Sequence, residues 1–125
     1  MDAGGRDADI TGVVEVAYLY YEGMVSGDKA MLNRAFHPRA SIVGNEGGEL
    51  YWATVEQFAA ECEAAAGQAG ERAWQIDGLS FEGDTALLRL GNRYAGVWYS
   101  DDLSMLRADG DWRIVHKTFY PHPAA

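Results

Sequence analysis

Residues 97–119 read VWYSDDLSMLRADGDWRIVHKTF, and this stretch decides the fold. Asp109-Gly110 at its centre is the strongest short signal for a hairpin, because both residues tolerate the positive φ that a tight two-residue turn requires. Apolar and polar residues alternate on both sides of the turn, as they do in strands with one buried face. The sequence therefore predicts two long antiparallel strands, Val97–Arg107 and Trp112–Phe119.

The two-residue turn also fixes which residues lie opposite one another. Counted outward from the turn, Leu103 lies opposite His116, and Asp102 lies opposite Lys117 as an expected outer-face ion pair. The more apolar face, which we take as the inward one, carries Val97, Tyr99, Asp101, Leu103, Met105, Ile114, His116 and Thr118. The outward face carries Trp98, Asp102, Ser104, Arg113, Lys117 and Phe119.

The first half of the chain predicts three helices. Apolar residues at helical spacing follow Asp9, which is a suitable N-cap for a long first helix. Asp28 caps a second, short helix, which ends at His37-Pro38 because the residue before proline disfavours the helical conformation. Thr54–Gln57 has the pattern of a capping box and begins a third helix, which ends at Gly67.

Four shorter patterns predict the remaining strands, at 40–43, 49–53, 74–81 and 85–94. Gly78 interrupts the alternation of the third pattern and marks a bulge. The predicted order is helix, helix, hairpin, helix and then a run of long antiparallel strands, which is an α+β fold.

The length of 125 residues suits one hydrophobic core, so we expect a single domain over 1–125 with loose ends at 1–8 and 121–125. Nineteen acidic against ten basic residues leave a net charge of -9, which disfavours nucleic acids and anionic membranes as partners. Cys62 is the single cysteine, and the sequence has neither a signal-peptide pattern nor a membrane-spanning apolar run. We therefore expect a cytoplasmic protein.

Motifs for common cofactors are missing from the sequence. It contains no glycine-rich phosphate loop, no HExxH, no paired CxxC and no GxSxG. His37, His116 and His122 are far apart and lack the spacing of metal ligands. We expect neither a cofactor nor a metal ion, so function has to come from the side chains of a pocket.

The predicted element order and three local strings resemble the nuclear transport factor 2-like superfamily. The strings are YYEGMVSGD at 20–28, FHPRA at 36–40 and DGDWRIVHK at 109–117, and they look most like the branch labelled lumazine-binding. The resemblance spans about Val13–Phe119 and implies a cone-shaped α+β fold, in which a curved sheet wraps around a long N-terminal helix. The superfamily includes ketosteroid isomerases, dehydratases, polyketide cyclases and proteins without catalytic activity.

The isomerase branch of this superfamily implies roles for single residues. Tyr20 falls where that branch has the tyrosine of its oxyanion hole, and Asp101 has the strand parity of its protonated aspartate. Leu103 and Met105 follow where two phenylalanines line its cavity. Gly44 stands where the general-base aspartate would be, so the resemblance argues against steroid isomerase activity.

Asp101 and His116 form the sharpest candidate pair, because the predicted register points both inward as diagonal neighbours. A carboxylate that fixes a histidine tautomer is a common way to make a general base. The catalytic hypothesis makes His116 the base, Asp101 its partner or a proton donor, and Tyr20 a donor to a substrate oxygen. The alternative is a structural core histidine, a strand-end Asp101 bonded to backbone and a Tyr20 that only packs.

Aromatic residues make up 12% of the chain, more than a small core needs. A curved sheet closed by three helices leaves a tapered cavity, and we expect its ligand-binding residues to be Trp52, Tyr94, Tyr99, Leu103 and Met105. The expected ligand is a small apolar or weakly polar molecule. Three functions stay open: a small-molecule-binding protein, an isomerase, dehydratase or cyclase that uses acid–base chemistry, and a scaffold whose cone is filled.

Trp98 and Phe119 share the outward face of the predicted hairpin. An exposed aromatic patch is costly in a monomer. We therefore expect a homodimer that forms through the sheet.

Overall fold

The computed structural model describes residues 3–124 and confirms the α+β class. In chain order the elements are α1 (Ala3–Ser26), α2 (Lys29–Ala35), β1 (Phe36–Glu46), β2 (Glu49–Thr54), α3 (Val55–Ala64), β3 (Ala73–Glu82), β4 (Thr85–Tyr94), β5 (Val97–Ala108) and β6 (Asp111–Pro121). The strands form one sheet in the order β2-β1-β6-β5-β4-β3. β1 and β6 run parallel, and all other neighbours are antiparallel.

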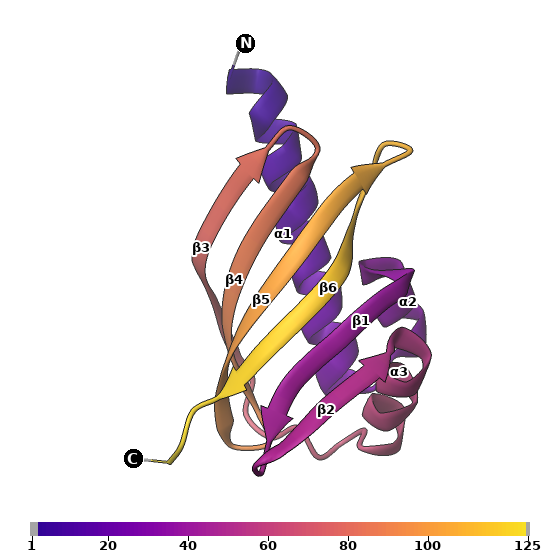
Figure 1. The fold of residues 1–125 in the computed structure, drawn as a ribbon, viewed down its shortest axis with the longest axis vertical. Helices are drawn as coiled ribbons and strands as arrows, with labels where there is room; N and C mark the ends of the chain where they lie inside the picture. Colours follow the sequence, from indigo (N-terminus) through magenta and orange to yellow (C-terminus); the bar gives the residue numbers. More distant parts are fainter. Residues whose placement is uncertain (1–2, 125) are drawn as a thin grey trace.

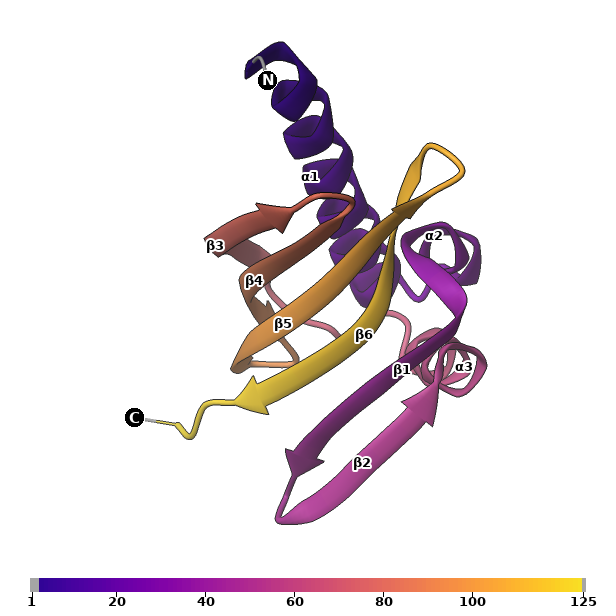
Figure 2. The same cartoon turned by 45° about the horizontal axis from the view of Figure 1, so that its top comes forward.

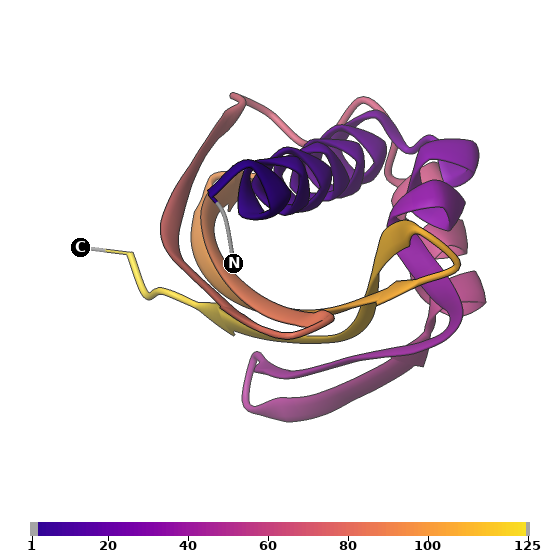
Figure 3. The same ribbon diagram turned by 90° about the horizontal axis from the view of Figure 1, so that it is seen from above.

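The sheet is curved and open, and α1 lies along its concave side (Figure 1). Seen from above, the strands wrap around α1, while α2 and α3 stand together at the β1 side (Figure 3). Figure 2 shows β1 and β2 as a hairpin at the edge of the sheet, next to β6 and α3. This arrangement is the cone that the resemblance implies. No helix among residues 3–124 is long and apolar enough to cross a membrane.

Side-chain hydrogen bonds confirm two of the predicted helix starts. Asp28 caps α2, and its carboxylate accepts a hydrogen bond from the backbone N–H of Met31 at 3.1 Å. Thr54 and Gln57 form both hydrogen bonds of the capping box at the start of α3. Gly78 marks a register shift in β3, as predicted.

The predicted N-cap at Asp9 is wrong, because α1 begins further upstream and Asp9 lies inside the helix. The Asp9 carboxylate instead accepts hydrogen bonds from Arg107 Nη1 at 2.7 Å, Trp112 Nε1 at 3.2 Å and Arg6 Nη1 at 3.1 Å. Its polar group therefore ties α1 to the β5–β6 hairpin.

The expected loose ends are also shorter than predicted. Residues 3–8 belong to α1, and Pro121 is the last residue of β6. Residues 1–2 and 125 of these expected ends lie outside the described residues.

The β5–β6 hairpin has the predicted turn but changes register along its length. Asp109 and Gly110 have φ of 53° and 83°, and Met105 pairs with Ile114 as predicted. Directly beyond this pair the register shifts by one residue, because β6 contains Val115 as an extra residue in a β-bulge. Since side chains alternate along a strand, the extra residue exchanges the two faces of β6 beyond it.

This exchange reverses the predicted orientation of four residues: Lys117 and Phe119, predicted outward, and His116 and Thr118, predicted inward. Beyond the bulge Leu103 pairs with Lys117, and Asp101 pairs with Phe119. Lys117 and Phe119 therefore point to the concave side of the sheet, and His116 points to the convex side. The inward His116 of the sequence prediction is wrong.

The predicted ion pair between Asp102 and Lys117 is wrong for the same reason. Asp102 lies on the convex side, where its carboxylate accepts two hydrogen bonds from Arg89 of β4, at 2.7 and 3.2 Å. Lys117 lies on the opposite side of the sheet and is 5% exposed.

The hydrophobic core fills the half of the cone near the β5–β6 turn. Fully buried side chains of the sheet pack there against the apolar stripe of α1. The sheet contributes Leu88, Leu90, Leu103, Met105 and Ile114. Packing is less complete toward the other end, where β4 passes into β5.

Candidate functional site

The concave side contains a cavity of about 310 Å³ between the C-terminal part of α1, α3 and the sheet. Aromatic rings make up much of its wall, with a few polar groups among them, which is typical of ligand pockets. The lining residues are Tyr20, Met24, Glu46, Tyr51, Phe58, Glu61, Cys62, Ala65, Asn92, Tyr94, Tyr99, Asp101, Lys117 and Phe119.

Asp101 of β5 is buried at the wall of this cavity, with 1% of its surface exposed. Its Oδ2 accepts a hydrogen bond from the Tyr20 hydroxyl at 2.6 Å and from the Asn92 side-chain amide at 2.9 Å. Its Oδ1 has no hydrogen-bond partner among residues 3–124, and neither has Oδ1 of Asn92. A buried acceptor left unpaired costs about 1–3 kcal/mol, so its presence calls for an explanation.

Tyr20 of α1 holds Asp101 from the helix side. Its side chain is fully buried, and its ring packs edge-on against Phe36 with 5.7 Å between ring centroids. Burial raises the pKa of Tyr20 well above its ordinary value, and the nearby Asp101 carboxyl raises it further. The phenol therefore keeps its proton and acts as a hydrogen-bond donor.

Lys117 of β6 brings a buried amine to the same cluster. Its Nζ lies 4.0 Å from Asp101 Oδ2, which is longer than a hydrogen bond. Three aromatic rings surround Nζ, with centroid distances of 4.5 Å to Phe58, 4.8 Å to Tyr20 and 5.3 Å to Phe119. Burial lowers the pKa of Lys117, and the attraction of Asp101 opposes part of this shift.

Two tyrosine–glutamate pairs form the rim of the cavity. The Tyr51 hydroxyl donates to Glu61 Oε1 at 3.0 Å, and the Tyr99 hydroxyl donates to Glu46 Oε2 at 3.0 Å. Burial, with the neighbouring carboxylates, raises the pKa of both tyrosines. With Asp101, the cavity has three carboxyl groups in its lining against one amine, so its electrostatics disfavour an anionic ligand.

Cys62 of α3 also lines the cavity, but its thiol is not a reactive nucleophile. Burial raises the pKa of the Cys62 thiol to about 11, against a smaller opposing effect of Lys117. At neutral pH it is a thiol and not the reactive thiolate. Within residues 3–124, no three His, Cys, Asp or Glu side chains lie close enough to hold a metal ion.

The structure brings together some of the residues predicted for the site. Tyr20 and Asp101 are hydrogen-bonded to each other, and Tyr94 and Tyr99 both line the cavity. His116 is not at the cavity, because the bulge turns it outward, and its Nδ1 lies 2.8 Å from Ser41 Oγ on β1. The expected contact of Asp101 with His116 is therefore wrong.

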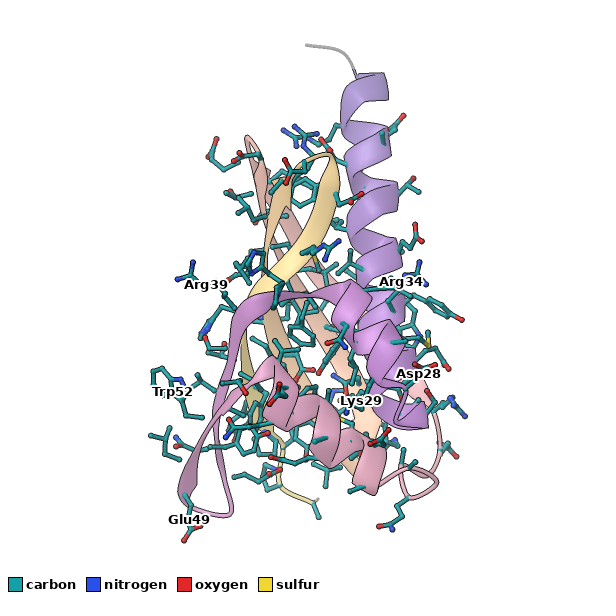
Figure 4. The ribbon with its side chains drawn as sticks, turned by 90° about the vertical axis from the view of Figure 1, so that its right-hand side faces the viewer. Asp28, Lys29, Arg34, Arg39, Glu49 and Trp52 are labelled. Carbon is teal, nitrogen blue, oxygen red and sulfur yellow. The ribbon has the colours of Figure 1, made fainter. Side chains whose placement is uncertain are left out.

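Three residues predicted to bind the ligand lie elsewhere. Leu103 and Met105 belong to the packed core and do not line the cavity. Trp52 is 68% exposed and points away from the helices on the convex side of β2 (Figure 4). Its position follows from strand alternation, since its neighbours Tyr51 and Ala53 point inward.

Gly44 of β1 has a steric role at this end of the cone. A Cβ at this position would lie 2.6 Å from the Phe119 ring, so a larger residue would require that ring to move. Phe119 thus occupies the space beside the position where the isomerase branch has its general base.

Sequence reasoning missed Lys117, Phe119 and Asn92 as parts of the site. Asn92 sits among inward residues of β4, where a polar residue in an apolar alternation was a usable signal. Lys117 and Phe119 gave no such signal, because Val115 is an ordinary strand residue and does not mark the bulge.

The comparisons with known proteins cover nearly the whole chain. The family model described as “Putative lumazine-binding” matches residues 8–120. An NTF2-like protein of unknown function from Silicibacter pomeroyi is 35% identical with a TM-score of 0.89, over 94% of this chain and 98% of that chain. Another, from Methylobacillus flagellatus, is 28% identical with a TM-score of 0.82, over 93% and 94%. Aldolase FrzH of Cladobotryum sp is 26% identical over 113 residues, 89% of this chain and 90% of that protein.

Proposed function

The chain belongs to the family described as “Putative lumazine-binding”, within the nuclear transport factor 2-like superfamily, and from this basis we propose that its cavity binds a small, neutral carbonyl compound. In this proposal Asp101 moves a proton at the carbon next to the carbonyl group, and Tyr20 holds Asp101 in place. The protein then acts as a lyase or isomerase by acid–base chemistry, one of the three functions that the sequence leaves open.

The main support for this proposal is the hydrogen bonding of the two Asp101 carboxyl oxygens. Two donors, Tyr20 and Asn92, fix Oδ2, while Oδ1 has no partner among the described residues. One oxygen is thus held in orientation and the other is free to accept or deliver a proton, which is what a general base or acid needs.

The size, charge and shape of the cavity support the ligand class. A volume of about 310 Å³ is at the lower end of the range for ligand pockets, so the ligand is small. Glu46 and Glu61 at the rim favour a neutral molecule over an anion. The rings of Tyr94 and Phe119 favour a planar body. Lumazine, the compound in the family's description, is a planar ring system with carbonyl groups and agrees with these features.

The similarity to an aldolase also supports a carbonyl compound as the ligand. An aldolase forms or breaks a carbon–carbon bond next to a carbonyl group, and proton removal from that carbon is part of the chemistry. A buried carboxylate beside a small cavity is suited to the same step.

Hydrogen exchange in D₂O, followed by ¹H NMR on cyclohexanone and phenylacetaldehyde, tests this function. The protein is expected to accelerate loss of the signal from the carbon next to the carbonyl, and Asp101→Asn is expected to slow it by about 100-fold or more. Asp102→Asn is the matched control, because Asp102 lies on the convex side with Arg89. Equal rates for the wild type and Asp101→Asn would overturn the proposal.

A binding protein without catalysis is the second candidate, and the position of Gly44 favours it. Phe119 packs against Gly44, where the isomerase branch carries its base. This function predicts that lumazine, used as the probe in ligand-observed NMR, binds in the cavity. It also predicts that neither the wild type nor Asp101→Asn accelerates exchange of any carbonyl probe.

We further propose that two copies of the chain associate through the convex face of the sheet. Large apolar side chains are exposed on this face: Leu50, Trp52, Leu87 and Tyr120. Phe119 does not belong to it, because the bulge turns that ring inward. Sedimentation at micromolar concentration is expected to give twice the 13.7 kDa of one chain, and Trp52→Lys is expected to shift it to the monomer. A wild-type monomer would remove the proposal.

A further inference from the structure

We propose that Lys117 is the nucleophile of this cavity and forms a covalent imine with an aldehyde or ketone. The inference rests on the proposed binding of a carbonyl compound and goes one step further, since it names the atom to which the compound becomes bonded. It also explains why a lysine is buried on the concave side, where an apolar residue would cost less.

The surroundings of Nζ are those of a reactive amine more than of a structural ion pair. The Lys117 side chain is 6% exposed, and its Nζ is 4.0 Å from the nearest Asp101 oxygen, so no hydrogen bond ties the two together. The rings of Phe58 and Phe119 exclude water from Nζ, although their faces also attract an ammonium group. A lysine desolvated in this way is a recognised route to an activated amine nucleophile.

The protonation state of Lys117 supports the same role. Burial lowers its pKa, although Asp101 opposes part of the effect, so a larger fraction of the amine is neutral than at an exposed lysine. Cys62, the other nucleophile in the wall, has its pKa raised to about 11 and stays protonated. Of these two groups, the amine is the one prepared to attack a carbonyl carbon.

Imine formation requires only the Lys117 amine, the carbonyl compound and a group that carries protons. The lone pair of neutral Nζ forms a bond to the carbonyl carbon, and one proton passes from the nitrogen to the carbonyl oxygen to give a carbinolamine. A further proton, taken up from solvent, is added to the hydroxyl group, the carbon–oxygen bond breaks, and one water leaves. The C=N bond forms as a protonated imine, which keeps the last proton on nitrogen. Asp101, 4.0 Å from Nζ, is placed to relay these protons.

The imine would also assist the proton transfer assigned to Asp101. A protonated imine withdraws electrons more strongly than a carbonyl group, so the neighbouring C–H becomes more acidic. Asp101 can then remove that proton to give an enamine, which is the nucleophile of an aldol addition. Tyr20 keeps the carboxylate in position through its 2.6 Å hydrogen bond.

The chain offers an internal control, because Lys29 and Lys117 are its only two lysines. Lys29 lies on the surface at the start of α2, with 46% of its side chain exposed (Figure 4). A reagent that simply reacts with accessible amines will label Lys29 more than Lys117. A reagent captured in the cavity will label Lys117 first.

The experiment traps the imine by reduction. The folded protein is incubated near neutral pH with phenylacetaldehyde or cyclohexanone and sodium cyanoborohydride, which reduces C=N to a stable secondary amine. Intact-mass and peptide mass spectrometry then locate the added group. Lys117 is expected to be labelled at least about tenfold more than Lys29, because the cavity holds the carbonyl compound beside Nζ. Lys29→Ala is expected to leave the Lys117 label unchanged.

Lys117→Arg keeps the positive charge beside Asp101 but cannot form an imine, and it is expected to abolish the specific label. Circular dichroism checks that this variant folds, and peptide mapping of the wild type needs no variant. Preferential labelling of Lys29 would overturn the inference. If ligand-observed NMR shows cyclohexanone in the cavity while Lys117 stays unlabelled, the imine fails and the proposed binding stands. If neither is observed, both fail.

Discussion

Asp9 and Asp101 are both buried acids on the concave side, at opposite ends of the cone, and their surroundings differ. Asp9 lies near the β5–β6 turn, and each of its oxygens accepts a hydrogen bond. Oδ1 accepts from Arg107 and Trp112, and Oδ2 accepts from Arg6. This acid is fully paired, and its partners come from α1, β5 and β6, so it joins the helix to the hairpin.

Asp101 lies at the cavity end and is only half paired. Its Oδ2 accepts from Tyr20 and Asn92, its Oδ1 has no partner among residues 3–124, and Lys117 stays 4.0 Å away. The comparison separates a polar cluster that stabilises the fold from one that costs stability and leaves groups available for chemistry. We expect replacement of Asp9 to lower the free energy of unfolding, and joint replacement of Asp101 and Lys117 by apolar residues to raise it.

The largest expected effect on stability is that of Asp9→Ala. It removes hydrogen bonds to two arginines and leaves Trp112 Nε1 buried without its acceptor, so the free energy of unfolding should fall by about 2–3 kcal/mol. Urea denaturation measures this change. The control is Asp7→Ala, an exposed acid two residues earlier, where a change within about 0.5 kcal/mol is expected. Equal effects of the two variants would mean that the Asp9 cluster stabilises nothing.

The double variant Asp101→Leu/Lys117→Met should have the opposite sign. It replaces a buried, imperfectly paired acid and base by apolar side chains of similar size, a change that in other proteins is neutral or stabilising by about 1–4 kcal/mol. We expect a higher urea midpoint together with loss of the D₂O exchange activity. A double variant less stable than the wild type would place the Asp101 cluster in the same structural class as Asp9.

Tyr20→Phe should cost about 1 kcal/mol of stability, since it removes one hydrogen bond to Asp101. It should also slow exchange of the carbonyl probes, because Asp101 loses the donor that orients it. Tyr21→Phe is the matched control on the same helix: that hydroxyl donates to the Arg93 carbonyl oxygen at 2.7 Å and accepts from the Ala73 amide. It should lose similar stability with unchanged exchange. Slower exchange in both variants would assign the effect to general loosening of α1.

The two clusters also show how far the sequence can predict this molecule. Caps at Asp28 and Thr54 and the turn at Asp109-Gly110 depend on a few adjacent residues, so they could be read locally. The bulge at Val115 could not, because it depends on pairing along both edges of β6. The pairing of β6 with β1 shifts in the same region as its pairing with β5, and β1 is far from β6 in the chain.

The missed bulge accounts for most of the error at the candidate site. With the predicted register, His116 would face inward and Phe119 would face solvent. The observed register packs the half-buried Phe119 ring against Gly44 and Tyr51, and it carries Lys117 inward as well. Partial burial of a large aromatic ring favours this register, while the buried amine opposes it. The alternation of apolar and polar residues along one strand does not show which of these two effects is larger, so it could not predict the register.

The smallest expected effect is a pH dependence that only the cavity cluster should show. In the folded protein burial holds the pKa of Lys117 below its ordinary value of 10.5. Between the folded and the ordinary value the unfolded chain binds more protons at this lysine, so the free energy of unfolding should rise with pH across that window. Below the window the full cost of burying the charge applies.

The difference in stability between the wild type and Lys117→Met isolates this contribution from Tyr20 and the other titrating groups. We expect this difference to shift in favour of the wild type as the pH rises toward 10.5. The difference between the wild type and Asp9→Ala should stay flat over the same range, since it involves no lysine. A flat Lys117→Met difference would mean that the amine is as well stabilised as in water and is not activated.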